Sequence, residues 1–515
     1  MTLFAGAPGR SRSRALGRVN PALFSLLLLL IFLTWTNVYE ASHLPFWYDE
    51  IFTVAVTRLP SMPAIWRALA HAVDSSPPGF YALERLASAF ASDELIAFRL
   101  ASIAALPIVS LCLFAFVQRR LGSLSALIAA VVPLLTVLYS QYSLEARPYA
   151  PMLACLSIAI LAWQRASSWW WLTVLGASMA AAVSEHYYAV FALVPFSIAA
   201  VTEFAVHGEL RARTWIVFVS AVIPLLVFWP LLHHLHETYA AHYFLVPNLP
   251  YAIGTYDWYF AARPPGIIAA LAVVISTALV TRAAAPSRFF AGRTREPYER
   301  PEEISLIAGF IWLPIIVLLG TMAAGGGLVA RYAIGGILGL ALGIAYASHL
   351  LGRTAQRVLL IGLLAALGFQ QVFTIEAPRT LRRDRLNQDL AVLGIARDPS
   401  LPIVVSDGVD FLPLAYYRSR TDPPLVALID REAAVRFSGS DSVDLDLASL
   451  RDYFALQVSE YPEFARQHER FLLYSTSGRF DWWPARLVQD HYLLQVIARD
   501  GKATLYRVAR QPQGP

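Results

Sequence analysis

The stretch LPFWYDEIFTVAVTRLPSMPAIWRALAHAVDSSPPGFYAL, residues 44–83, lies between two apolar runs, and the rest of the chain is organised around it. It is too long and too polar to be a simple connector. It carries the acidic pair Asp49 and Glu50 among aromatic residues, and Asp74 shortly before two prolines. Carboxylates held close to a bilayer are costly to desolvate, so we expect this loop to carry chemistry.

The composition of the chain identifies a membrane protein. Of its 515 residues, 57% are hydrophobic and only 15% are charged, which is more apolar than an ordinary soluble protein. The formal charge of +5 does not indicate nucleic-acid binding, because the arginines gather in short segments between apolar runs. Both cysteines, Cys112 and Cys155, fall within predicted spans, so we expect neither a disulfide nor a thiolate metal site.

Apolar runs of the length that crosses roughly 30 Å of hydrocarbon recur through the first three quarters of the chain. They lie at 21–36, 95–117, 124–140, 149–163, 169–183, 187–203, 214–232, 266–281, 304–322, 332–350 and 357–374. The predicted fold is an α-helical polytopic membrane domain, residues 1–376, with about eleven spans and a long first outer loop at 37–94. A signal peptide is the alternative for the first run, but no clear small-residue cleavage site follows it.

Basic residues set the predicted orientation of the spans. Each segment assigned to the inner side contains arginine: Arg10, Arg12, Arg14 and Arg18, then Arg119, Arg120, Arg165, Arg211, Arg213, Arg282, Arg288, Arg293, Arg295, Arg300, Arg353 and Arg357. By the positive-inside rule the amino terminus is cytoplasmic, and an odd number of spans places the carboxyl-terminal domain outside. We therefore expect a multi-pass protein of the bacterial inner membrane with a periplasmic carboxyl-terminal domain.

Residues 377–515 lack such runs and are typical of a soluble α/β domain. The segments LPIVVSD and PPLVALID predict buried strands, with a helix near Phe411–Tyr417 between them and another over 449–470. The segment HYLLQVIARDGKATLYRVAR predicts a hairpin that turns at Asp500 and Gly501. The sequence leaves open whether this domain touches substrate.

Asp49 and Glu50 are the candidate catalytic residues. Adjacent residues on a helix point about 100° apart, so the two carboxylates cannot face the same pocket. We expect one to be catalytic and the other structural. The alternative is that both cap an interfacial helix or pair with Arg58.

Two arginines are candidates for binding a lipid-borne phosphate. Arg147 lies in YSQYSLEARPYAP with Glu145 and Tyr149, where a span begins, and its planar fork can bind two oxygens at once. Arg331, followed by Tyr332, breaks the charge rule by lying outside, which favours a specific partner. The alternative for Arg147 is a membrane anchor paired with Glu145.

The segment HHLHETYAAH is a candidate metal site. It contains His233, His236 and Glu237, and His233 and Glu237 are one helical turn apart. Neutral imidazole and carboxylate together can bind a divalent ion. The alternative is that these histidines only form hydrogen bonds at the membrane interface.

The order of these motifs resembles the GT-C glycosyltransferases, in particular the branch of protein O-mannosyltransferases and lipid A aminoarabinose transferases. The resemblance rests on Trp47-Tyr48-Asp49-Glu50 in a long first outer loop, Asp74 before Pro-Pro-x-x-Tyr ending at Tyr81, Ala-Arg-Pro-Tyr at 146–149 and a later Arg331-Tyr332. It covers about 370 residues of the membrane part, and the individual motifs are short.

The resemblance implies a polyprenyl-phosphate sugar donor and transfer on the outer face with inversion. It implies that Asp49 is the general base, and that Arg147 and Arg331, with Tyr149 and Tyr332, bind the donor phosphate. Asp74, Tyr81, Glu145 and His186 are the remaining candidates for substrate contact. In the aminoarabinose branch a Glu-Lys precedes the prolines and its glutamate helps to hold a metal. Here Asp74-Ser75-Ser76 takes that place, so a metal held by Asp74, His233, His236 and Glu237 is a hypothesis.

The predicted reaction is a single displacement in which Asp49 accepts the proton of an acceptor hydroxyl on a protein, lipid or polysaccharide. Two alternatives come from other classes. A transporter or flippase for lipid-linked sugars would show pairs of broken helices or an inverted repeat, and the sequence shows neither. A non-catalytic envelope assembly factor would release no polyprenyl phosphate.

Overall fold

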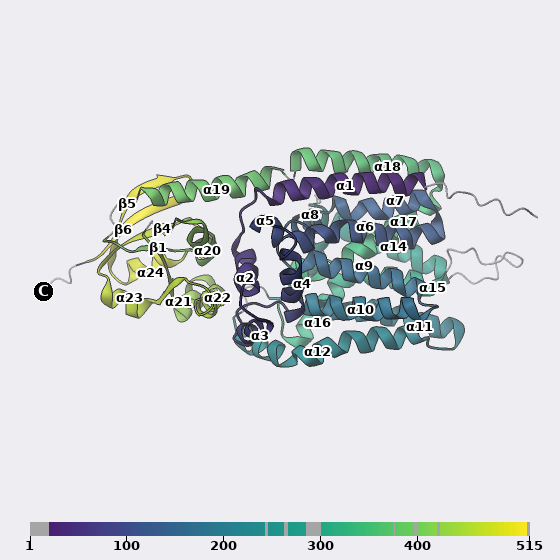
Figure 1. The fold of residues 1–515 in the computed structure, drawn as a ribbon, viewed down its shortest axis with the longest axis horizontal. Helices are drawn as coiled ribbons and strands as arrows, with labels where there is room; N and C mark the ends of the chain where they lie inside the picture. Colours follow the sequence, from purple (N-terminus) through teal and green to yellow (C-terminus); the bar gives the residue numbers. More distant parts are fainter. Residues whose placement is uncertain are drawn as a thin grey trace, which may run out of the picture.

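The computed structural model describes residues 20–242, 246–261, 266–284, 300–374, 376–395, 400–419 and 423–511. A bundle of long helices forms one end of the molecule and an α/β domain forms the other, with short helices between them (Figure 1). Of the arginines used to predict orientation, Arg10, Arg12, Arg14, Arg18, Arg288, Arg293 and Arg295 lie outside the described residues.

Every predicted apolar run is helical. The bundle comprises α1 (Pro21–Ala41), α6 (Leu100–Leu121), α7 (Ser123–Val131), η1 (Val132–Leu135), α8 (Val137–Tyr142), α9 (Tyr149–Arg165), α10 (Trp169–Glu185), η2 (Tyr187–Ala192), α11 (Leu193–His207), α12 (Ala212–Tyr239), α13 (Leu249–Phe260), α14 (Ile267–Ala284), α15 (Pro301–Ile311), α16 (Leu313–Ala324), η4 (Ala330–Ala333), α17 (Gly336–Leu350), α18 (Gly352–Phe369) and η5 (Gln370–Thr374). The polytopic helical class predicted from the sequence is confirmed.

Fewer helices have the length of a membrane span than the apolar runs in the sequence predict. Among the described residues, five helices are long and apolar enough to cross a membrane, or up to six if α15 and α16, which meet at 63°, count as one broken span. Other runs form helices shorter than the roughly 20 residues that a straight span needs; α9 and α10 have 17 residues each. The figure of about eleven spans therefore stays a prediction.

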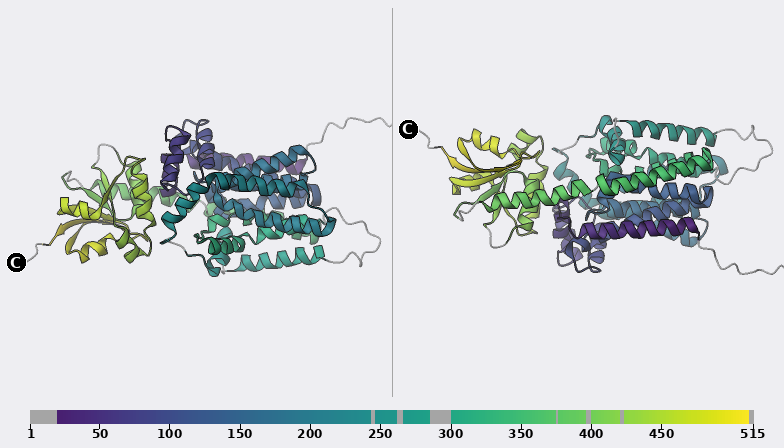
Figure 2. Two further views of the ribbon diagram at one scale, coloured as in Figure 1. Left: turned by 90° about the horizontal axis from the view of Figure 1, so that it is seen from below. Right: turned by 90° about the horizontal axis from the view of Figure 1, so that it is seen from above.

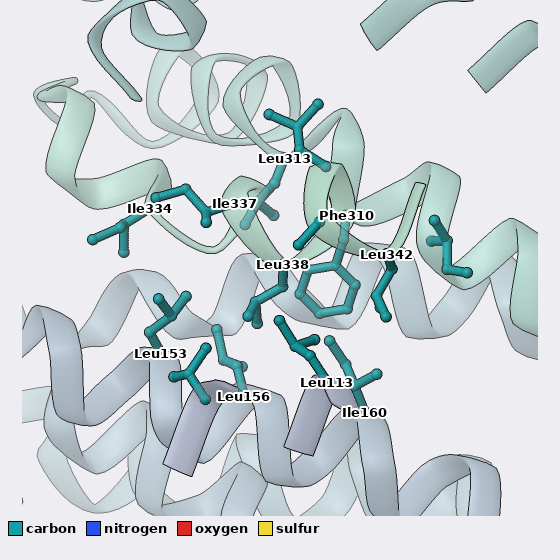
Figure 3. Packing of buried hydrophobic residues seen from close by; sticks show 14 of the residues in the cluster. Leu113, Leu153, Leu156, Ile160, Phe310, Leu313, Ile334, Ile337, Leu338 and Leu342 are labelled. Carbon is teal, nitrogen blue, oxygen red and sulfur yellow. The ribbon is translucent and has the colours of Figure 1, made fainter. Parts of the chain in front are cut away.

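The core of the bundle lies where α6 and α9 meet α15, α16 and α17. Figure 3 shows leucine and isoleucine side chains of the first pair facing those of the second group around Phe310. Gly339 lets α17 approach α15 closely, because a Cβ there would come within 2.2 Å of the Ile311 nitrogen. Small residues permit this approach between helices in a membrane, where dispersion contacts rather than water exclusion hold them together.

The first outer loop is folded into short helices across the end of the bundle that faces the α/β domain (Figure 1). These helices are α2 (Tyr48–Thr57), α3 (Met62–Ala70), α4 (Pro78–Ser88) and α5 (Glu94–Ala97). Ser61 caps α3 by accepting from the Ala64 N–H, and α4 begins on Pro78, whose fixed φ suits a first helical turn. Ile51, Ile65 and Phe80 are fully buried, so the loop is a packed platform.

The carboxyl-terminal domain is a six-stranded sheet with helices on it. After α19 (Glu376–Gly394), its elements are β1 (Ile403–Val405), α20 (Gly408–Tyr417), β2 (Leu425–Ile429), α21 (Arg431–Ser438), α22 (Ser442–Leu450), β3 (Gln457–Glu460), α23 (Tyr461–Gln467), β4 (Arg470–Ser475), α24 (Trp483–Gln489), β5 (Tyr492–Asp500) and β6 (Ala503–Arg510). The strand order is β3-β2-β1-β4-β6-β5, with β1 parallel to both β2 and β4. The predicted strands, the helix near 411–417 and the terminal hairpin are confirmed.

One helix prediction for this domain holds only in part: α23 (Tyr461–Gln467) is helical as expected, but the stretch before it is not a continuous helix. Residues 449–470 were expected to be helical, but the helix α22 ends at Leu450 and 457–460 form the edge strand β3, paired in parallel with β2. The strand β4 that follows was missed, although four apolar residues, Phe471 to Tyr474, lie buried at its centre. Pairing with neighbouring strands decided this region, and a local pattern does not contain that information.

The helix α19 connects the two parts of the molecule. It continues beyond α18 and runs alongside the sheet, as the view from above shows (Figure 2). Contacts between the first outer loop and α20 hold the two parts together: the Phe46 N–H donates to the Tyr417 hydroxyl at 2.6 Å, and Phe46 packs edge-on against Tyr416. The α/β domain is therefore docked on the platform.

Candidate active site

A cavity of about 420 Å³ lies between the platform, the end of the bundle and the α/β domain. Its polar lining includes Asp49, Asp74, Arg147, His186, Arg331 and Asp446. Five of these six residues were candidates from the sequence alone. They come from segments separated by almost 400 residues, so only the fold brings them together.

Asp49 and Arg331 form an ion pair on the cavity wall. The Asp49 Oδ2 and the Arg331 Nη2 are 3.6 Å apart, and the two side chains remain 18% and 20% exposed. Asp49 lies in the first turn of α2, where the free N–H groups and the helix dipole favour a carboxylate. Arg331 also lies over the rings of Tyr149 and Tyr332, at 5.7 and 5.8 Å from their centroids.

Arg147 is tied to the platform from the opposite direction. Its Nη1 donates to the Asp74 carboxylate and to the Asp49 backbone oxygen, both at 3.1 Å. The hydroxyl of Tyr81 donates to the same Asp74 carboxylate. Among the described residues, the Nε of Arg147 and the Nε of Arg331 have no hydrogen-bond partner. Two guanidinium groups with unused donors beside one cavity suit an anion such as a phosphate.

Glu50 points the other way, into the core of the platform. It is fully buried and receives two hydrogen bonds from Arg99, at 2.7 and 2.8 Å, and one from the Ala146 N–H at 2.9 Å. It does not line the cavity. Of the two carboxylates named as catalytic, Asp49 faces the cavity and Glu50 forms a structural ion pair.

The structure does not form the two pairings that the sequence left open as alternatives. Arg58 pairs with Glu94 at 2.9 Å, so the acidic pair is not held by Arg58. The Glu145 side chain contacts Gln141 at 3.0 Å and Arg382 at 3.3 Å, so Arg147 is not an anchor paired with that carboxylate. Arg99 and Arg382 were missed; the signal for Arg99 was a cation near the start of an apolar run.

The predicted metal ligands do not assemble into one site. His233 and Glu237 approach to 3.5 Å, but their side chains are 57% and 60% exposed. His236 lines the cavity instead, and Asp74 forms an ion pair with Arg147. Within the described ranges, no group of three or more His, Cys, Asp or Glu side chains is placed to hold a metal. His233 and Glu237 are one turn apart on α12, as predicted, but neither residue lines the cavity.

An aromatic cluster supports the arginine side of the cavity. The ring of Tyr332 lies 4.4 Å from Tyr188 and 5.3 Å from His186, measured between centroids. The Tyr188 hydroxyl donates to the Gly327 oxygen at 2.6 Å, which fixes the glycine-rich segment before Arg331. Tyr81, Glu145 and Tyr149 lie behind the lining and act on the cavity only through other residues.

The α/β domain contributes a carboxylate that was not expected from the sequence. Asp446 accepts hydrogen bonds from the Tyr239 hydroxyl at 2.6 Å and the Tyr48 hydroxyl at 3.1 Å. Burial raises the pKa of Asp446 to about 7, and the two phenols act against that rise. The local sequence SVDLDLASL resembles any half-exposed helix, so it gave no signal of this position.

Comparison with known proteins supplies the fold family. The model for the dolichyl-phosphate-mannose-protein mannosyltransferase family matches residues 75–234. The crystal structure of ArnT from Cupriavidus metallidurans bound to undecaprenyl phosphate matches with a TM-score of 0.55 at 12% identity, over 95% of this chain and 98% of that one. The chain has the GT-C fold. The apo structure of the same ArnT matches with a TM-score of 0.54 at 12% identity, over 94% of this chain and 98% of that one.

The family match covers only part of the GT-C cavity. Arg147 and His186 lie within residues 75–234, whereas Asp49, Asp74 and Arg331 lie outside them. No curated protein sequence matches the chain. The resemblance drawn from the motifs is confirmed by the family match and by the fold. Two of its four motifs, residues 77–81 and 146–149, lie within the matched residues.

Proposed function

We propose that this protein is a membrane glycosyltransferase that moves a sugar from a polyprenyl-phosphate donor to an acceptor hydroxyl. The observation that carries the proposal is the joint placement of Asp49, Arg331 and Arg147 on one cavity at the end of a helical membrane bundle. The GT-C fold and the undecaprenyl phosphate bound to ArnT support the same donor class.

In this proposal the two arginines hold the donor phosphate. A polyprenyl phosphate entering from the bilayer replaces the Asp49 carboxylate as the partner of Arg331 and uses the free Nε donors of Arg331 and Arg147. Their charge stabilises the phosphate as it leaves, so the reaction needs no general acid. Stacking on Tyr149 and Tyr332 keeps the Arg331 guanidinium in place.

Asp49, once released from Arg331, is the general base. The acceptor oxygen attacks the anomeric carbon, the bond from that carbon to the phosphate oxygen breaks, and the hydroxyl proton passes to Asp49. The products are the glycosylated acceptor with inverted configuration and polyprenyl phosphate. The enzyme mainly positions the reactants and supplies charge, which are the two largest contributions in such transfers.

The proposed location is the outer face of the bacterial inner membrane, with the amino terminus cytoplasmic and the α/β domain periplasmic. Ion pairs at the far end of the bundle support this orientation. Arg120 pairs with Glu303 at 2.5 Å and Arg213 with Glu203 at 2.9 Å. These arginines fit cytoplasmic ends under the positive-inside rule.

The proposal is tested by incubating the purified full-length protein with radiolabelled undecaprenyl-phosphate sugars and an envelope extract from a strain that lacks it. The expected result is free undecaprenyl phosphate released in step with labelled acceptor. A flippase would move the donor without releasing it, and an assembly factor would leave it intact. Either result with every sugar of the panel would refute the proposal.

A further inference from the structure

The edge of the α/β sheet that faces the membrane bundle is the edge where this type of fold binds ligands. From β1 the chain runs to β2 and β3 on one side, and then returns to β4 on the other side of β1. In parallel sheets, ligands bind beyond the carboxyl ends of the strands at this point of reversal. Val409 and Phe480, which follow β1 and β4 closely, line the cavity, and Asp446 joins them from α22, a helix of the connection between β2 and β3.

Asp446 is the carboxylate that this edge presents to the cavity. Each of its oxygens accepts one phenol hydrogen bond, from Tyr239 to Oδ1 and from Tyr48 to Oδ2. Each carboxyl oxygen carries two lone pairs, and each accepts only one hydrogen bond here, so the group has acceptor positions left for a ligand. Tyr48 precedes Asp49 in α2, so the second bond places Asp446 close to the proposed base.

The two walls of the cavity differ in access, and each carries both signs of charge: Arg479 lines the α/β side with Asp446, and Asp49 and Asp74 line the other side with the arginines. Arg147 and Arg331 belong to the bundle side, where the isoprenoid tail of a donor must remain in the bilayer. The α/β domain lies beyond the platform, away from the long helices (Figure 1). A second substrate approaches from that side, where the lining includes Asp446, Arg479 and the aromatic rings of Tyr48, Tyr239 and Phe480.

We propose that Asp446 binds the hydroxyl groups of a carbohydrate acceptor, so that the α/β domain selects what receives the sugar. A carboxylate beside aromatic rings matches a sugar, whose hydroxyls donate to oxygen and whose C–H face packs on rings. This inference rests on the proposed function and deepens it, because it assigns the acceptor side of the same cavity.

A purely structural role is the alternative, because Asp446 also joins the α/β domain to Tyr48 and Tyr239. Three variants separate the two roles. Asp446→Asn removes the charge from the cavity. Tyr417→Phe removes another bond between the domains, the one from the Phe46 N–H, at a position outside the cavity lining. Asp490→Asn alters a carboxylate that accepts from the Tyr461 hydroxyl at 2.6 Å, also outside the lining.

The test measures transfer by each purified variant while either the envelope extract or the labelled undecaprenyl-phosphate sugar is varied. Asp446→Asn is expected to raise the half-saturating amount of extract about 10- to 100-fold, with the half-saturating donor concentration changed less than about twofold. Tyr417→Phe and Asp490→Asn are expected to behave as the wild type. Asp446→Glu, which keeps the charge, is expected to recover part of the loss, and it replaces the Asn variant if that variant does not fold.

The inference is overturned if Asp446→Asn matches the wild type, if the donor requirement rises together with the acceptor requirement, or if Tyr417→Phe reproduces the effect. An extract whose labelled products are not carbohydrates would also overturn it. All of these results presuppose transfer by the wild-type protein. Absence of that transfer is instead the failure of the proposed function, so the two failures are distinguishable.

Discussion

The two faces of α2 hold adjacent carboxylates in opposite environments. Glu50 is fully buried and bonded twice to Arg99, at 2.7 and 2.8 Å. Asp49 is 18% exposed, and its ion pair with Arg331 is loose at 3.6 Å and open to a cavity. The two residues lie in the same helical turn and carry the same type of charge. Their environments differ because the fold packs different residues against each side of the helix.

This difference separates a structural ion pair from an exchangeable one. A buried pair with every oxygen satisfied cannot lose a partner without leaving an uncompensated charge. A partly exposed pair at longer distance, such as Asp49 with Arg331, can exchange its partner for a ligand at a smaller cost than a buried one. We therefore infer that the Glu50 face of α2 serves stability and that the Asp49 face serves substrate binding.

Asp49→Asn should have the largest effect on activity. The amide keeps the size of the side chain but cannot accept the acceptor proton, so the transfer rate should fall about 10²- to 10⁴-fold. Transfer by the purified variant measures the rate, and its melting temperature should stay close to that of the wild type. A variant with wild-type transfer would remove Asp49 as the base.

Glu50→Gln should show the opposite pattern, a loss of folding stability. It leaves the Arg99 guanidinium buried against a neutral amide, which should cost about 3–5 kcal/mol of folding stability. Thermal unfolding of the detergent-purified variant, followed by tryptophan fluorescence, measures this loss. If Glu50→Gln stayed as stable as the wild type while losing transfer, the roles of the two faces would be exchanged.

Arg331→Gln should weaken binding of undecaprenyl phosphate. Loss of a charged donor costs about 1.5–3 kcal/mol, which corresponds to roughly 10- to 100-fold in affinity. Binding of tritiated undecaprenyl phosphate to the purified protein measures it. Arg58→Gln is the matched control, since Arg58 pairs with Glu94 on the platform and is outside the cavity lining; equal losses in both variants would contradict the assignment.

Asp444 is a buried carboxylate with no ion-pair partner among the residues that the structure describes, and its substitution should have the smallest effect. Burial raises the pKa of Asp444 from 3.8 to about 7, so between about pH 4 and pH 7 the folded state keeps a proton that the unfolded state has lost. Stability falls as the pH rises through that window. Asp444→Asn removes this penalty, and we expect its stability relative to the wild type to improve by on the order of 1–2 kcal/mol from pH 5 to pH 8.

The control for this prediction is Asp452→Asn, because the Asp452 side chain is 76% exposed. Melting curves of the three proteins at pH 5 and pH 8 are compared. Equal pH dependence in the wild type and Asp444→Asn would show that Asp444 does not titrate in this range.

The membrane class and much of the site could be predicted from the sequence, because the signals are local. Hydropathy marks most of the bundle helices, although no predicted run covers α13 (Leu249–Phe260). A charge at a membrane surface is unusual enough to be noticed from the local sequence. Asp49, Asp74, Arg147, His186 and Arg331 were each identified in this way, and all five line the cavity.

The partners of these residues could not be predicted, because partner choice depends on packing between distant segments. Glu50 selects Arg99, 49 residues later, although Arg58 is much closer in sequence. Asp446 reaches the cavity only because the α/β domain docks on the platform. The number of spans could not be predicted for the same reason. Breaks such as the one between α15 and α16 depend on tertiary contacts, which hydropathy does not describe.

The central claim is that the cavity face of α2 and the two arginines form the donor site. A cryo-electron microscopy structure of the wild-type protein with undecaprenyl phosphate tests it most directly. The account predicts phosphate density between Arg147 and Arg331, with the Asp49 carboxylate released from Arg331 and facing the cavity. Phosphate density elsewhere, with the Asp49–Arg331 pair intact, would contradict it.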